Sequence, residues 1–269
     1  MAQLAEAVGR VRVHDHLCLI YETQEERFAA VVPFIGAGLR LGEKCIYVVD
    51  ENTADTVLAA IRAGGIDAES AVGSGALAVL SKQESYLKDG CFDPDRMIGF
   101  LKEAIDQARQ EGHSALRVTG EMTFVLGGDP GVERLMEYEA KLNYFFPDND
   151  ALAICQYNRS RFAPELIMEV IRTHPLVISG GLVCRNLYFV PPDEYLKPDR
   201  PSLQVDRLLR NIIERERAEE RIMERTAELE RKNAELETLL KSFVNREARM
   251  VEMKEKIREL EERITGLER

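Results

Sequence analysis

The stretch Leu152-Ala-Ile-Cys-Gln-Tyr157 contains only one strongly polar side chain, that of Gln156, in six residues. Its length is that of a single β-strand. The lack of polar and apolar alternation is typical of a strand that is buried on both faces, as in a parallel sheet. The run Leu17-Cys-Leu-Ile-Tyr21 has the same character. These two runs predict a buried sheet with helices on both sides.

Outward from these runs, strand-like and helix-like segments alternate along the chain. Short apolar runs and helically spaced apolar residues indicate strands at 44–49, 76–80, 115–118 and 186–190 and helices at 28–39, 53–63, 94–105, 133–145 and 164–172. Buried strands that alternate with crossover helices predict an α/β fold with a three-layer, mostly parallel sheet. We assign this domain to residues 1–196, followed by a linker at 197–202.

The last quarter of the chain, 203–269, has a different periodicity. An apolar residue occupies every seventh position at Ile222, Leu229, Leu236, Phe243, Met250, Ile257 and Ile264. A strict period of seven predicts a long helix with a coiled-coil seam. The second core position of the same frame holds Arg225, Lys232 and Arg246. Because charged core residues weaken association, we expect the distal part of this arm to pair more strongly.

The seam could face a second chain, or the arm could fold back on itself as a hairpin. There is no Gly or Pro between 203 and 265 to make a turn. The sequence therefore favours a homodimer that pairs through 222–267.

Charge and composition exclude several classes of protein. The arm holds 16 Lys and Arg against 17 Asp and Glu, so about −10 of the net charge of −11 lies on the globular part. An acidic domain repels phosphate backbones, so we expect no direct nucleic-acid binding. Without a long apolar run or leader, and with five scattered cysteines, the sequence predicts a cytoplasmic protein with reduced thiols and no membrane contact.

The composition of the first strand-to-helix junction, Tyr21-Glu-Thr-Gln-Glu-Glu-Arg27, indicates whether a nucleotide can bind there. A phosphate-binding loop would place glycines, a Lys and a Ser or Thr there, whereas this junction has no glycine and three carboxylates. It predicts that a triphosphate is repelled. Glu121 follows the strand at 115–118 and could hold magnesium or act as a base, but without a phosphate loop a capping or loop-fixing role is favoured.

His14-Asp-His16-Leu-Cys18 is the strongest local constellation of chemically active residues. Side chains two apart on a strand point the same way, so His14, His16 and Cys18 could share a face and bind zinc, copper or a haem iron. The alternative is that His14 lies in a loop and Cys18 is a core residue. Cys155 could add a ligand, and His174 could cap a helix or face the ligand.

Four blocks of the sequence resemble the MEDS domain, a sensory domain of methanogens and methylotrophs named for the dichloromethane-responsive regulator. They are His16-Leu-Cys-Leu-Ile-Tyr-Glu22, Ile154-Cys-Gln-Tyr-Asn-Arg-Ser-Arg-Phe162, Arg172-Thr-His-Pro175 and Asn186-Leu-Tyr-Phe-Val-Pro-Pro192, within about 12–196. The resemblance implies a RecA/KaiC-like fold without a phosphate loop and a sensor of small hydrocarbon derivatives, with His16 and Cys18 as ligand contacts. Motif and position together predict a ligand site formed by His16, Cys18, Tyr21, Glu22, Glu121, Cys155, Tyr157 and His174.

Two pieces of the arm also resemble signalling proteins. Arg225-Thr-Ala-Glu-Leu-Glu230 resembles the helix before histidine-kinase dimerisation domains, and 245–254 resembles a segment that follows sensory domains. No phosphoacceptor helix or kinase ATP-binding box follows in the chain, so we expect no enzyme activity and either a stand-alone sensor or a fragment of a longer protein.

We therefore predict a dimeric sensor for a small molecule that acts on a separate output protein, such as a histidine kinase of a two-component system or a transcription regulator. The alternatives are a metal, haem or redox sensor using His16 and Cys18, a degenerate RecA-like ATPase with Glu121 as base, and a scaffold that binds only another protein.

Overall fold

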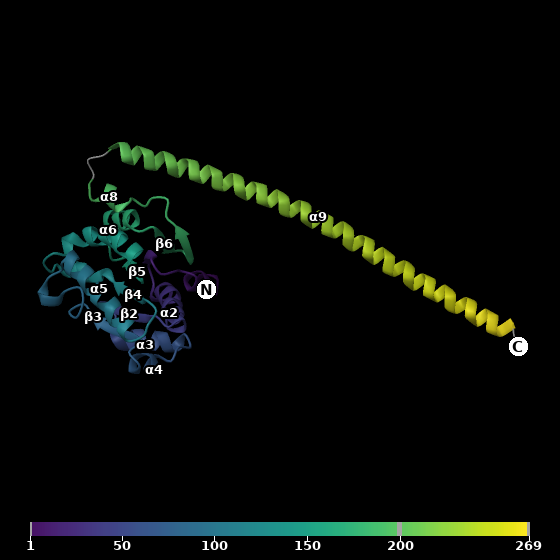
Figure 1. Cartoon of the computed structure of the whole chain (residues 1–269), viewed down its shortest axis with the longest axis horizontal. Coiled ribbons are helices and arrows are strands. Elements are labelled where there is room, and N and C mark those ends of the chain that lie inside the picture. The colour runs from purple at the N-terminus through teal and green to yellow at the C-terminus, as the bar shows by residue number, and fades with distance from the viewer. Residues whose placement is uncertain (1, 198–200, 268–269) are drawn as a thin grey trace. The chain divides into compact units, whose positions relative to one another are not determined.

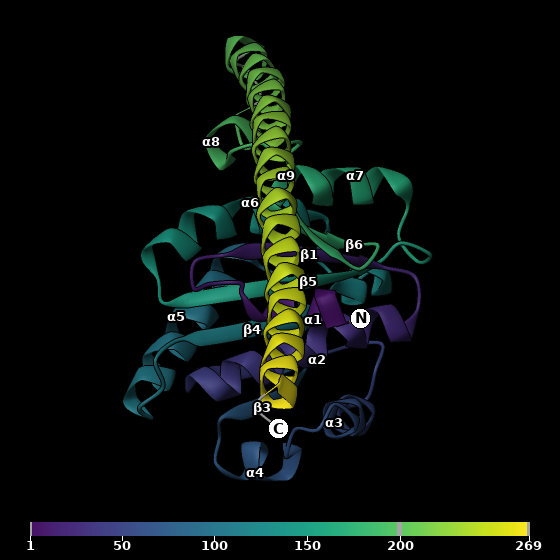
Figure 2. The ribbon, with the colours of Figure 1, turned by 90° about the vertical axis from the view of Figure 1, so that its right-hand side faces the viewer.

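Seven strands form one sheet within the part of the chain that the computed structural model describes, residues 2–197 and 201–267. The strand order is β3-β2-β4-β5-β1-β6-β7, and all neighbours pair in parallel except β6 and β7, which are antiparallel. The strands are β1 (His16–Tyr21), β2 (Lys44–Val49), β3 (Leu77–Ser81), β4 (Leu116–Glu121), β5 (Ala151–Asn158), β6 (Leu176–Ser179) and β7 (Leu182–Arg185). The apolar runs at 17–21 and 152–157 are the neighbouring strands β1 and β5, which lie side by side in Figure 2.

Helices cover both faces of the sheet. They are α1 (Ala2–Gly9), α2 (Gln24–Leu41), α3 (Ala54–Ala63), α4 (Ala68–Gly73), α5 (Pro94–Gln110), α6 (Leu135–Phe145), α7 (Pro164–Thr173) and α8 (Pro192–Tyr195). Short 3-10 helices lie at Lys88–Gly90, Met122–Gly127, Val132–Arg134 and Phe146–Asp148. One core cluster packs α1 to α4 on the sheet and the other packs α5 to α7, and Figure 1 shows β4 and β5 between α5 and α2. The predicted three-layer, mostly parallel α/β fold is confirmed.

Local signals define the helix that follows β1. Thr23 is the N-cap of α2 and accepts a hydrogen bond from the backbone N–H of Glu26. Gly42 ends the helix in the left-handed region at φ 72°, where its N–H binds the carbonyls of Gly38 and Leu39. The predicted end of this helix at Gly42 therefore has a conformational cause.

The prediction of a strand at 186–190 is wrong. The chain instead forms the β6–β7 hairpin just before it, and the two turn residues Gly180 and Gly181 have φ values of 56° and 77°, as a tight hairpin turn requires. The Asn186 side chain donates hydrogen bonds to the carbonyls of Ile171 and His174, which holds 186–190 against the end of α7 as an irregular segment. Helices α1 and α4 form in addition to the helices predicted from the sequence.

The second compact unit of the chain, which follows Pro201, is a single helix. Helix α9 (Pro201–Leu267) begins inside the expected linker and runs without interruption, so the hairpin alternative for the arm is wrong. The long C-terminal helix itself is confirmed. Its seam residues Ile222, Leu229 and Leu236 are each at least half exposed in the single chain. Among the described residues, no helix combines the length and the apolar character needed to cross a membrane.

Candidate functional site

Four donor-bearing side chains converge in the core between the sheet and the helices α6 and α7. They are His16 from β1, Glu139 from α6, Cys155 from β5 and His174 directly after α7, and one ligand atom from each lies within 4.8 Å of the others. All four side chains are buried. We call this group the His–Glu–Cys cluster. Because side chains alternate along a strand, His16, Cys155 and Tyr157 all point to the α6 face.

Glu139 is the centre of the cluster. Its Oε2 lies 3.2 Å from His16 Nε2 and 3.3 Å from His174 Nε2, and the Cys155 Sγ is 3.5 Å away. The Tyr157 hydroxyl donates a hydrogen bond to Oε1 of the same carboxylate. One carboxylate therefore contacts side chains from two strands and from the loop after α7.

The hydrogen bonds at the outer edges assign the tautomers of both histidines. Asn143 directs its NH₂ group at the carbonyls of Glu139 and Thr173, so its Oδ1 is free to accept from His16 Nδ1 at 3.1 Å. His174 Nδ1 lies 2.7 Å from the carbonyl of Val170 and donates to it. Each Nδ1 thus carries the hydrogen, and each Nε2 presents a lone pair to the centre of the cluster.

Electrostatics favour a neutral His16 beside an ionised Glu139. Burial and the neighbouring His174 lower the pKa of His16 below its usual value. Burial alone would raise the pKa of Glu139, but His174 and His16 outweigh burial when a proton on Nε2 makes them donors, and they then hold that pKa well below its usual range. The centre of the cluster is therefore rich in lone pairs and negative charge, and such a centre attracts a cation or a proton.

Two of the three predicted metal ligands lie outside the cluster. His14 precedes β1 with a φ of 80°, so the alternation of side chains along a strand does not apply to it, and its Nδ1 lies 2.8 Å from the carbonyl of Phe146. Cys18 points to the same sheet face as His16, but its Sγ lies 3.9 Å from the carbonyl of Leu176 on β6. The set His14, His16 and Cys18 is thus not brought together.

Glu121 and Tyr21 face the opposite side of the sheet, toward α2. The Glu121 Oε2 accepts hydrogen bonds from the backbone N–H groups of 50–52, at distances of 3.2, 2.7 and 3.0 Å, and its Oε1 is 3.2 Å from Arg27 Nη1. The guanidinium of Arg27 lies 5.0 Å from the centre of the Tyr21 ring. Glu121 has the loop-fixing role that the sequence favoured, because its oxygens are occupied by the chain itself.

The predicted ligand residues therefore separate into three places. His16, Cys18, Cys155, Tyr157 and His174 lie on the α6 face, Tyr21 and Glu121 lie on the α2 face, and Glu22 is exposed with its Oε1 3.2 Å from Arg159. Sequence reasoning missed Glu139 and its neighbour Asn143. The available signal was a carboxylate inside the apolar stripe of α6, where Leu135, Tyr138 and Leu142 are buried beside it.

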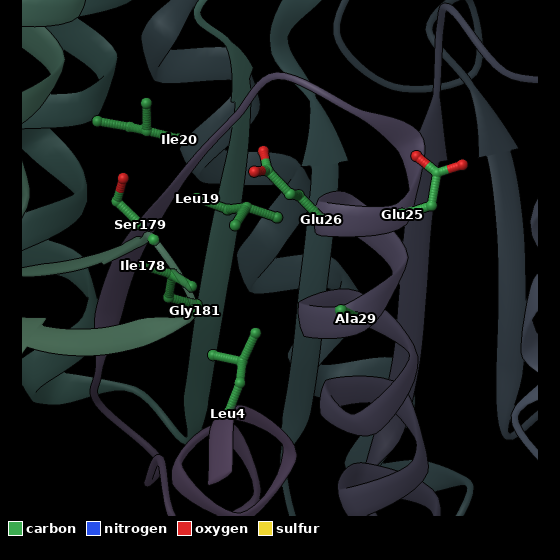
Figure 3. Close-up of a pocket in the computed structure, with 10 residues that line it drawn as sticks. Leu4, Leu19, Ile20, Glu25, Glu26, Ala29, Ile178, Ser179 and Gly181 are labelled. Carbon is green, nitrogen blue, oxygen red and sulfur yellow. The ribbon is translucent and has the colours of Figure 1, made fainter. Parts of the chain in front are cut away.

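A cavity of about 210 Å³ lies at the carboxyl ends of β1 and β6. Its lining is mostly apolar and consists of Leu4, Leu19, Ile20, Glu25, Glu26, Ala29, Ile178, Ser179, Gly180 and Gly181. Figure 3 shows Glu26 directed toward Leu19, with Leu4 on α1 below them. We call this space the β1–β6 cavity. It is separate from the residues of the His–Glu–Cys cluster.

The cysteines should differ sharply in reactivity. Burial raises the pKa of Cys18 and Cys155 well above its usual value and that of Cys45 to about 12, whereas Cys184 is exposed and Cys91 is partly exposed. Since the thiolate is the reactive form, we expect two fast-reacting thiols per native chain with an aromatic disulfide reagent at pH 8, and five after denaturation.

The matched control for the thiol count is the double variant Cys91→Ser/Cys184→Ser. It should lose the fast phase and keep three thiols that react only after denaturation. A third fast thiol in the native wild-type protein would contradict the buried placement of the other cysteines.

Comparison with known proteins identifies the family. The family model "MEDS: MEthanogen/methylotroph, DcmR Sensory domain" matches residues 15–175, which is more than half of the chain. The chain belongs to the MEDS family. The matched range contains the whole His–Glu–Cys cluster. The resemblance found in the sequence is thereby confirmed, and residues 15–175 form a sensory domain.

A characterised relative and two solved structures are similar to this MEDS protein. The transcriptional repressor DcmR of Methylorubrum extorquens is 25% identical over 168 residues, which cover 61% of this chain and 59% of the repressor. The chain thus spans about three fifths of the length of that relative. An uncharacterized protein from Pyrococcus horikoshii, solved with an unknown peptide, has a TM-score of 0.52 at 13% identity, covering 66% of this chain and 81% of its own. A KaiC-like protein from the same archaeon has a TM-score of 0.44 at 16% identity, covering 61% and 69%.

The similarity to the uncharacterized protein supports only the fold of the MEDS domain, because the two sequences are only 13% identical. The relationship to DcmR, together with the family match, assigns a sensory or signalling role to the chain.

Proposed function

We propose that this MEDS protein is a sensor that binds a small, largely apolar molecule in the β1–β6 cavity and relays its binding through α9 to a separate output protein. The observation that carries the proposal is the position and chemistry of the cavity. Parallel α/β sheets place ligands at the carboxyl ends of their strands, and the cavity opens at the ends of β1 and β6. The MEDS match and the DcmR relative support a sensory role for this domain.

The size and lining of the cavity define the class of ligand. A volume of about 210 Å³ suits a molecule of few heavy atoms. Leu4, Leu19 and Ile178 supply apolar contact, while Glu26 and Ser179 offer a carboxylate and a hydroxyl at one side. A short hydrocarbon derivative with one polar or weakly cationic group meets these requirements.

The neighbouring strand ends favour a binding protein over an ATPase. The junction after β1 has the side-chain N-cap of Thr23 in place of a glycine-rich loop, and Glu25 and Glu26 lie in the first turn of α2. Arg27 on α2 forms a buried ion pair with Glu121 at the end of β4. A nucleotide phosphate would meet carboxylates there instead of free backbone N–H groups.

The chain offers a short covalent route from the cavity to the arm. Ile178 and Ser179, which line the cavity, end β6, and the chain then passes through β7 and α8 before α9 begins at Pro201. Hydrogen bonds attach helix α8 to the domain: among them, Tyr144 donates to Asp193, and Tyr195 donates to Glu169 on α7. Only about twenty residues of chain thus separate the β6–β7 turn from the start of α9, and a conformational change at the turn can be transmitted along them.

The output requires a partner for α9. Its heptad seam is exposed from Ile222 to Ile257 in the single chain, and a row of exposed apolar side chains on a helix is typical of an association surface. We propose that two chains pair through this seam and that the ligand changes the pairing in its weaker proximal part. The regulated protein is a transcription regulator or a histidine kinase; the first is supported by the repressor DcmR.

Filling the cavity tests the proposal. Ala29 lines the cavity on α2, so Ala29→Leu should weaken binding of its ligand at least tenfold, because the added atoms occupy the ligand's volume. Ala59→Leu is the matched control, since Ala59 is exposed on the helix α3. Binding of short-chain alcohols, methylamines and chlorinated methanes would be measured by ligand-observed NMR. Equal binding by both variants, or no binding by the wild type, would refute this site.

For the metal, haem or redox alternative, the structure favours an ion over a haem. His16 and Cys18 are fully buried, so a haem would have to displace the surrounding core to reach them. The form of this alternative that fits the packing is a single ion within the His–Glu–Cys cluster.

A further inference from the structure

We propose that His16, Glu139, Cys155 and His174 bind a divalent transition-metal ion, with Zn²⁺ as the first candidate. The proposal does not depend on a ligand in the β1–β6 cavity. It rests on the convergence of four donor atoms of the right chemistry at one buried point.

The donors are arranged to accept a cation. Both Nε2 atoms present lone pairs, because both Nδ1 atoms donate to fixed acceptors, Asn143 Oδ1 and the Val170 carbonyl. His174 Nε2 is buried and makes no hydrogen bond of its own, although Glu139 Oε2 lies 3.3 Å away. A buried polar atom without a partner is costly, and three acceptors that face one another are costlier still. A cation at their common centre removes this conflict.

The distances approach those of a tetrahedral site. Zinc bonds of about 2.0–2.3 Å separate neighbouring ligand atoms by roughly 3.3–3.6 Å. Four of the six donor pairs lie in or close to this range, at 3.2 Å for His16–Glu139, 3.3 Å for His174–Glu139, 3.5 Å for Cys155–Glu139 and 3.7 Å for Cys155–His16. The two remaining pairs, which join His174 to His16 and to Cys155, lie within 4.8 Å. A small rotation of the His174 ring toward the centre completes the set.

The supporting hydrogen bonds are of the kind that orients metal ligands. A histidine that binds a metal through Nε2 normally donates its Nδ1 hydrogen to an oxygen acceptor, and both histidines do so here. The second oxygen of Glu139 accepts from Tyr157, which leaves Oε2 directed at the centre. The four side chains are thus held by their neighbours before any ion arrives.

The chemistry of the donors selects the class of ion. Two imidazoles, one carboxylate and one thiol suit zinc, cobalt, iron or copper, whereas magnesium and calcium require oxygen ligands. With four protein ligands and complete burial, the coordination sphere would be closed, which is typical of a structural or regulatory ion. The competing arrangement is a proton on one Nε2 that is shared with Glu139.

A bound ion would link the sheet to the layer that carries α8. It would join β1 and β5 to α6 and to the end of α7. Tyr144 at the end of α6 and Glu169 on α7 are the partners of α8. Occupancy of the site would therefore set how firmly the helices next to α8 are held against the sheet.

Cobalt substitution tests the site on the full-length chain. The background variant Cys91→Ser/Cys184→Ser removes the two accessible thiols and leaves Cys18, Cys45 and Cys155. After chelator treatment and addition of Co²⁺, we expect about one ion per chain, a thiolate-to-cobalt charge-transfer band and the visible absorption of tetrahedral cobalt. Zn²⁺ should displace the cobalt and abolish both absorptions.

A matched pair of cysteine variants locates the thiolate. In the same background, Cys155→Ala should abolish the charge-transfer band and lower metal affinity at least tenfold, whereas Cys18→Ala, on the same sheet face, should leave both unchanged. Glu139→Gln should lower the affinity while retaining the band. If the background variant binds no cobalt, or if the band persists in Cys155→Ala, the proposal is overturned. If Cys155→Ala does not fold, Cys18→Ala/Cys45→Ala in the same background decides, because it keeps Cys155 as the one thiol: the band should persist, and its loss would overturn the proposal.

Discussion

Replacing Glu121 with Ala is expected to destabilise the α/β domain by about 3–5 kcal/mol. The substitution removes the only carboxylate paired with the fully buried guanidinium of Arg27 among the described residues. It also leaves the backbone N–H groups of 50–52 without their shared acceptor, and the Tyr47 hydroxyl with Gln156 Oε1 as its remaining acceptor. A buried charge and several donors would then be unpaired at once, which is why the expected loss is large.

The stability of the α/β domain can be measured separately from that of α9 through its tyrosine signals. The chain has no Trp, and all eight tyrosines precede α9, so near-ultraviolet circular dichroism during urea unfolding reports on that domain alone. The control is Glu6→Ala, which breaks an exposed helical ion pair with Arg10 and should cost no more than about 0.5 kcal/mol. A loss below about 1 kcal/mol for Glu121→Ala would contradict a fixing role for this carboxylate.

Placing Lys at two seam positions of the arm, Met250→Lys/Ile257→Lys, is expected to convert the proposed dimer into a monomer. Both side chains are exposed in the single chain and would be buried against a partner. Burying such side chains contributes about 1.5–3 kcal/mol each, and four of them are lost per dimer. The dissociation constant of the dimer should therefore rise by more than about 100-fold. Sedimentation equilibrium measures the effect directly.

The control for the seam variant lies on the outer side of the same turns. Ala248→Lys/Glu255→Lys adds the same side chains at positions that a two-stranded coiled coil leaves in solvent, so it should remain dimeric. If both variants sediment like the wild type, the seam does not hold the chains together. A monomeric wild type at tens of micromolar would overturn the pairing itself.

The sequence by itself determined the features that are written in local patterns. The unalternating runs at 17–21 and 152–157 identify β1 and β5, because a strand covered on both faces has no solvent side to mark with polar residues. The junction 21–27 excludes a glycine-rich loop by its composition alone. The arm shows its seam in the same way, since a period of seven needs no tertiary information.

The sequence did not predict the β6–β7 hairpin, and the strand that it predicted at 186–190 is wrong. The β6–β7 strands have four residues each and are recognisable mainly by the turn at Gly180 and Gly181. The segment 186–190 has the composition of a strand, but Asn186 binds carbonyls at the end of α7 and keeps it irregular.

Only the tertiary structure decided which candidate residues share a site. The sequence could show that His16 and Cys155 lie on strands, but not that these strands are neighbours, because their pairing joins residues more than 130 positions apart. It could not show that Glu139 faces them from α6, while Tyr21 and Glu121 point to the other side of the sheet. Alternation along a strand tells which residues share a face; the crossover packing of α6 and α7 determines which carboxylate and which histidine meet that face.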